Sequence, residues 1–146
     1  MQIEQEFLPF KLPPVAARLA AATGALGIAT GAAFVAAFDP AKSTFFPVCL
    51  LYSLTGFACP GCGLTRGFHE LFHGRFIPAL DFNLFVPVWA VILGYVWLSL
   101  ALLAVRGRGL PMWVTSPRFL WGFLIALLAF GVVRNIPAWP FTILFP

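Results

Sequence analysis

Long uncharged stretches alternate with short polar ones along this chain. Leu19–Phe38 has 20 residues without a charge and Leu84–Val105 has 22. About 20 apolar residues are enough to cross a hydrocarbon core roughly 30 Å thick. A third stretch, Phe119–Val133, has 15 residues and can be extended through Pro117, since proline is tolerated at a first helical position. The pattern predicts one all-α membrane domain over residues 1–146, with three transmembrane helices at about 16–38, 84–105 and 118–135.

The first predicted span is rich in Ala and Gly, which favours close packing against a neighbouring helix. Asp39-Pro40 ends it, because proline disfavours the helical conformation of the residue before it. A cleaved signal peptide is the alternative interpretation, with Val35-Ala36-Ala37 as the cleavage site. The acidic leader and the length of the run count against it, because the apolar region of a signal has about 7–15 residues.

Residues 43–65 are also uncharged, but prolines and glycines interrupt them. Hydropathy alone allows a fourth span there. Irregular backbone is tolerated at membrane depth only where protein covers it, so we expect residues 43–80 to form a re-entrant or interfacial cap between the first and second spans. A short helix is predicted from Cys62 to His73, stopped by Gly74. Asn83 is predicted to be the N-cap of the second span, with Pro87 in its first turn.

Composition places this chain in a lipid bilayer. It is 61% hydrophobic and 10% charged, with a mean hydropathy of +0.94, whereas soluble domains have about 25% charged residues. The net charge of +4 comes from scattered basic residues, which excludes a nucleic-acid footprint.

Basic residues also predict the orientation of the chain. The side with the N-terminus and the loop after the second span has five, and the cysteine side has four, two of which we expect in a site. This bias predicts a cytoplasmic N-terminus and places the cysteines outside. The five are Lys11, Arg18, Arg106, Arg108 and Arg118.

Sulfur chemistry is concentrated in Cys59-Pro60-Gly61-Cys62-Gly63. A tight turn of this kind can direct both thiolates at zinc or another thiolate-binding metal. Tetrahedral zinc takes four ligands, so Cys49, with His69 or His73, could complete the set. The two histidines are four residues apart, as one ion requires, but Arg66 and Glu70 beside them also fit an ordinary solvated helix face.

Two other interpretations of the cysteines stay open. Cys59 and Cys62 form a C-x-x-C pair at a helix start, where a dithiol can cycle with a disulfide in redox catalysis. Alternatively the pair is a static disulfide or a pair of inert buried thiols, and the odd number of cysteines leaves Cys49 over.

Polar residues at the ends of the predicted spans form a second constellation on the cysteine side. Charges at span edges are usually paired, so we expect a polar pocket in which Asp39 pairs with Arg66 or Arg134. The alternative is helix caps with a snorkelling arginine. The pocket residues are Asp39, Arg66, Asn83, Arg134 and Asn135.

These residues together resemble a family of small bacterial membrane proteins of unknown function, defined by a Cys-Pro-x-Cys-Gly-x-Thr-Arg signature. The resemblance is carried by Asp39-Pro40, Pro47-x-Cys49, Thr55-Gly56, Cys59–Arg66, Leu71, Gly74, Ala79, Asn83 and Arg134-Asn135. Leu84 stands where the family often has proline. The resemblance implies the membrane class and adds no activity.

The predicted function is therefore that of a non-enzymatic inner-membrane protein whose Cys/Arg cap binds a metal ion or anchors a partner. One alternative is a membrane thiol–disulfide oxidoreductase that uses Cys59 and Cys62. Another is an accessory subunit of a larger membrane complex, or a homo-oligomer, assembled through the Gly/Ala face of the first span.

Overall fold

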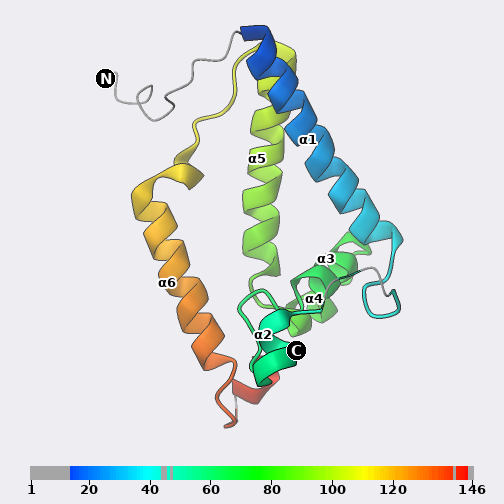
Figure 1. Ribbon diagram of the computed structural model, residues 1–146, viewed down its shortest axis with the longest axis vertical. Coiled ribbons are helices and arrows are strands. Elements are labelled where there is room, and N and C mark those ends of the chain that lie inside the picture. Colours follow the sequence, from blue (N-terminus) through cyan, green and yellow to red (C-terminus); the bar gives the residue numbers. More distant parts are fainter. Residues whose placement is uncertain (1–13, 44–45, 47, 140, 145–146) are drawn as a thin grey trace.

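The computed structural model describes residues 14–43, 46, 48–139 and 141–144 (Figure 1). Within these residues the chain is all-helical and has no strand, which confirms the all-α prediction. The elements are α1 (Pro14–Ala37), α2 (Leu50–Thr55), α3 (Leu64–Phe72), α4 (Phe76–Phe82), α5 (Val86–Arg106), the 3₁₀ turn η1 (Trp113–Thr115), α6 (Pro117–Val133) and the 3₁₀ turn η2 (Phe141–Leu144).

Two helices in the described part of the chain, α1 and α5, are long and apolar enough to cross a membrane. α6 is apolar too but has only 17 residues. The start of α5 differs from the prediction, because Asn83 is the C-cap of α4 and Phe85 is the N-cap of α5. The side chain of Asn83 is engaged in contacts with an earlier part of the chain, described below. Pro87 lies in the first turn of α5, as predicted.

α1 and α5 pack against each other in opposite directions, close together at one end and diverging toward the other (Figure 1). Arg18 of α1 joins the close end: its Nε donates to the carbonyl of Ala104 at 2.9 Å and its Nη2 to that of Val105 at 2.7 Å. The last carbonyls of a helix have no partner within the helix, so Arg18 stabilises the end of α5.

α6 runs alongside α5 and is joined to it by aromatic rings. The Phe85 ring lies 4.9 Å from that of Phe130, and Trp89 meets Phe123 edge to face at 5.1 Å. At the opposite end of α6, the ring of Trp113 in η1 meets Phe119 edge to face at 4.8 Å. Aromatic pairs of this geometry contribute about 0.5–1.5 kcal/mol beyond their buried area.

Large apolar side chains cover the outer faces of the three long helices. Leu26 of α1 is 68% exposed, Val91 of α5 65% and Ile125 of α6 64%. An exposed apolar surface on this scale is consistent with a surrounding bilayer, where a helix satisfies its own backbone polar groups.

The short helices α2, α3 and α4 gather where α1 ends and α5 begins (Figure 1). α2 has only six residues and ends at Gly56, whose φ of 74° is left-handed. The described part of residues 43–65 therefore contains no helix long enough for a fourth span. α3 begins two residues later than predicted, because Gly63 also takes a left-handed φ of 81°.

Candidate metal-binding site

The three cysteines meet in one cluster at the N-terminal end of α2. The Sγ atoms of Cys49, Cys59 and Cys62 all lie within 4.8 Å of one another. Cys62 is buried and the other two are half-buried. Cys49 directly precedes α2, and the reversal at Gly56 returns the chain so that the Cys59–Cys62 loop lies beside it.

The loop that carries Cys59 and Cys62 is a tight turn. The N–H of Cys62 donates to the carbonyl of Cys59 at 3.0 Å, and that of Leu64 donates to Gly61 at 3.0 Å. The N–H of Cys59 points at the Sγ of Cys62 at 3.1 Å, and the two sulfurs are 3.0 Å apart. A backbone N–H directed at a sulfur stabilises negative charge on it, whether the sulfur is a thiolate or a metal ligand.

Arg134, the C-cap of α6, binds the backbone of this loop. It is 1% exposed, and its Nη1 donates to the carbonyls of Cys59 at 2.9 Å and Cys62 at 3.1 Å. Its Nε donates to the carbonyl of Leu144 at 3.2 Å, and its guanidinium lies 4.9 Å from the centre of the Phe130 ring. The remaining nitrogen, Nη2, is buried without a hydrogen-bond partner among the described residues.

Two asparagines complete the support of the loop. Asn83 Nδ2 donates to the carbonyls of Pro60 at 2.9 Å and Cys62 at 3.0 Å, while its Oδ1 accepts the N–H of Phe85 at 2.9 Å. Asn135 pairs with both backbone groups of Ala58 at 2.8 Å. We call Asn83, Arg134 and Asn135 the loop clamp, because all three bind the backbone of residues 58–62.

The three thiols are not equivalent. A hydrogen bond from the N–H of Tyr52 is the main cause that lowers the pKa of Cys49 to about 7, and hydrogen bonds with the other two thiols add to it. Burial is the main cause that raises the pKa of Cys62 to about 12, and hydrogen bonds with Cys59 and Cys49 add to it. A cation bound to all three sulfurs must therefore displace protons, which makes its affinity depend on pH.

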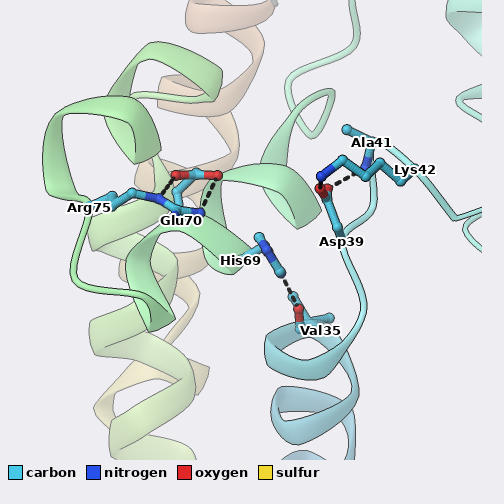
Figure 2. Close-up of polar contacts among 7 residues, drawn as sticks. All are labelled: Val35, Asp39, Ala41, Lys42, His69, Glu70 and Arg75. Atoms are coloured by element: carbon cyan, nitrogen blue, oxygen red, sulfur yellow. Dashed lines mark hydrogen bonds and ion pairs between the residues drawn. The ribbon is translucent and has the colours of Figure 1, made fainter.

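The two predicted histidine ligands lie outside the cysteine cluster. The Nδ1–H of His69 donates to the carbonyl of Val35 in α1 at 2.8 Å (Figure 2). That of His73 donates to the carbonyl of His69 at 2.8 Å, and the two rings are 4.4 Å apart. These bonds fix both rings near the end of α1. The spacing of four residues does put them on one face of α3, but that face is turned to α1.

The predicted partners of Asp39 also need correction. Its carboxylate pairs with Lys42 at 3.3 Å and accepts the N–H of Ala41 at 2.9 Å (Figure 2). Arg134 does not pair with it. Its described contacts are the carbonyls of the cysteine loop and of Leu144, and the ring of Phe130. Arg66 is exposed on α3 and is not part of the clamp.

Sequence reasoning did not single out the ion pair between Glu70 and Arg75 at the end of α3. Both guanidinium nitrogens Nε and Nη2 donate to the carboxylate of Glu70 (Figure 2). Arg75 thereby holds the pKa of Glu70 below its usual range. The signal was local: the turn at Gly74, whose φ of 74° is left-handed, brings together opposite charges five residues apart.

The described part of the chain is thus all-helical, with two helices able to cross a membrane and a three-cysteine cluster able to hold a metal ion. Residues 49–97 match the model of a family described as "Protein of unknown function (DUF2752)", which confirms the predicted resemblance to a family of unknown function. The match contains the three cysteines and Asn83 but not Arg134 or Asn135. No curated protein and no solved structure matches the chain.

Proposed function

We propose that this protein is a non-enzymatic, three-span protein of the bacterial inner membrane whose cap binds a thiolate-preferring metal ion, zinc or a similar ion, through Cys49, Cys59 and Cys62. The observation that carries the proposal is the meeting of three Sγ atoms within 4.8 Å. Soft thiolate donors select ions such as zinc or Cu(I).

The distances between the sulfurs suit such an ion. A tetrahedral ion with metal–sulfur bonds of about 2.3 Å separates its sulfurs by about 3.8 Å. The Cys59 and Cys62 sulfurs are 3.0 Å apart and all three lie within 4.8 Å. Small rotations about the side-chain bonds are enough to reach the coordinated geometry, while the loop clamp keeps the backbone in place.

The arrangement of the helices supports α6 as the third span. With 17 residues it is about 26 Å long, close to the hydrocarbon thickness of roughly 30 Å. Its C-terminal end lies on the same side as the start of α5 and the end of α1 (Figure 1). The basic residues at the opposite end, with Arg18, Arg106 and Arg108 exposed there, favour a cytoplasmic N-terminus and an outward cap.

The test is the metal content of the protein purified in detergent and incubated with zinc. We expect one ion per chain, and we expect Cys49→Ser to reduce bound metal as strongly as Cys62→Ser, since losing one ligand typically empties such a site. His73→Ala is the matched control and should keep the ion, because His73 lies outside the cluster. A wild-type protein that binds no metal, or a Cys49→Ser variant that binds as well as wild type, would refute the proposal.

The 3.0 Å separation of the Cys59 and Cys62 sulfurs also favours a second candidate function, thiol–disulfide exchange. In that reaction the two thiols lose two protons and two electrons to an incoming disulfide, which leaves as two thiols. Only this pair takes part. Cys49→Ser would then leave the reduction potential of the pair nearly unchanged, whereas Cys62→Ser abolishes the couple.

A further inference from the structure

We infer that the fourth ligand of the bound ion comes from outside this chain, as a water molecule that a small-molecule thiol can replace. The inference rests on the proposed metal site and adds its ligand class. It means that the ion is held by three protein sulfurs with one position open for exchange, unlike a closed structural site with four protein ligands.

The first reason is that the described residues offer no fourth donor to the cluster. The group of metal-ligating side chains contains the three cysteines alone. The ring of His69 is hydrogen-bonded to the carbonyl of Val35 in α1, and that of His73 to the carbonyl of His69 in α3. The carboxylates of Asp39 and Glu70 are engaged in ion pairs with Lys42 and Arg75. The remaining described carboxylate, Asp81, is exposed and is not in the cluster.

The second reason is that the described residues cover the cluster unevenly. On the inner side, Asn83 and Arg134 bind the loop carbonyls, and Pro60 packs so closely on α6 that a Cβ at Gly131 would lie 2.9 Å from its Cγ. On the outer side, Val48 and Gly61 are exposed, and Cys49 and Cys59 are only half-buried. A small ligand can therefore approach the ion from the surface of the cap.

The third reason is the charge of the site. Three thiolates and a divalent ion carry a net charge of −1, which the guanidinium of Arg134 beneath the loop offsets. A neutral water in the fourth position keeps this balance. A thiol replaces it when R–SH binds as the thiolate, water leaves, and the proton passes to solvent. The exchange adds one negative charge to the site, and the preference of soft ions for thiolate over water offsets that cost.

Cobalt(II) is the probe, because its sulfur-to-metal absorption band reports the number of bound thiolates. Protein in detergent is loaded with one equivalent of cobalt and titrated with 2-mercaptoethanol. We expect the band to grow by about a third, as Co–S bonds increase from three to four, with one thiol bound per ion. His73→Ala should show the same initial spectrum and the same titration.

Several results would overturn the inference. A spectrum that does not respond to saturating thiol would mean that the chain itself fills the fourth position. An initial spectrum altered by His73→Ala would identify that ligand as His73. Loss of cobalt without a four-sulfur intermediate would mean that the ion has no open position for a thiol. A protein that binds neither cobalt nor zinc refutes the proposed function itself, whereas the other results leave metal binding intact.

Discussion

Arg134→Leu removes three hydrogen bonds from the loop clamp. Arg134 donates to the carbonyls of Cys59, Cys62 and Leu144, and a hydrogen bond from a charged donor contributes about 1.5–3 kcal/mol. The carbonyl of Cys62 keeps its bond from Asn83 and that of Cys59 keeps its bond from the N–H of Cys62. Among the described contacts, only the carbonyl of Leu144 is left without a donor, at a cost of about 1.5–3 kcal/mol. Leucine avoids part of the penalty of burying a guanidinium. We therefore expect the free energy of unfolding to fall by about 2 kcal/mol.

The assay is thermal unfolding in detergent, followed by circular dichroism, together with the rate at which a maleimide labels Cys62. In the wild type Cys62 is buried, and loosening of the loop should raise its labelling rate. Arg118→Leu is the matched control, since Arg118 is exposed in the first turn of the same helix, and such a change is usually within about 0.5 kcal/mol. Arg134→Lys should fall between the two, because lysine keeps the charge but not the planar fork.

The outcome that refutes this reasoning is specific. If Arg134→Leu unfolds at the same temperature as Arg118→Leu and leaves Cys62 equally protected, Arg134 does not hold the loop. Its buried position would then reflect a snorkelling stem, and the hydrogen bonds to the loop would contribute no net stability.

Two further predictions concern α6 and the orientation of the chain. Gly131→Ala should destabilise the protein by about 1–3 kcal/mol in the same unfolding assay, because the added Cβ would press on Pro60. Gly122→Ala in the same helix is the control: its Cβ meets nothing within 4 Å, so the change should be neutral or slightly stabilising. Equal effects of the two changes would refute the close packing of α6 on Pro60. In a variant without the native cysteines, Arg108→Cys should resist an impermeant maleimide in intact cells while Asp81→Cys reacts; ready labelling of Arg108→Cys would reverse the proposed orientation.

The long helices were predictable because hydropathy and chain breakers are local signals. The first predicted span, 16–38, became α1 at Pro14–Ala37, and the third, 118–135, became α6 at Pro117–Val133. The start of the second was misplaced by two residues. Asn83 has the chemistry of an N-cap, but its amide nitrogen binds carbonyls 21 and 23 residues earlier in the chain. No local pattern distinguishes those two roles.

The site divides in the same way. The cysteine motif and its spacing indicated a thiol cluster, and the structure brings Cys49 to it. The role of Arg134 was not predictable, because its partners are backbone carbonyls, and every residue has one. The search for an acidic partner therefore led to Asp39, which pairs with Lys42 in its own turn. The spacing of His69 and His73 predicted that they share one face of α3, but it could not predict that His69 contacts α1 and not the cysteines.

The loop clamp comes from two separate parts of the chain, and one of them, at the end of α6, couples the cysteine site to that helix. The family match over residues 49–97 contains the cysteines and Asn83, yet Arg134 and Asn135 follow the end of α6 and bind the same loop. α6 meets α5 through aromatic rings. A shift of α6 along its axis would draw both clamp residues away from residues 58–62. The shape of the thiol cluster therefore depends on the position of α6.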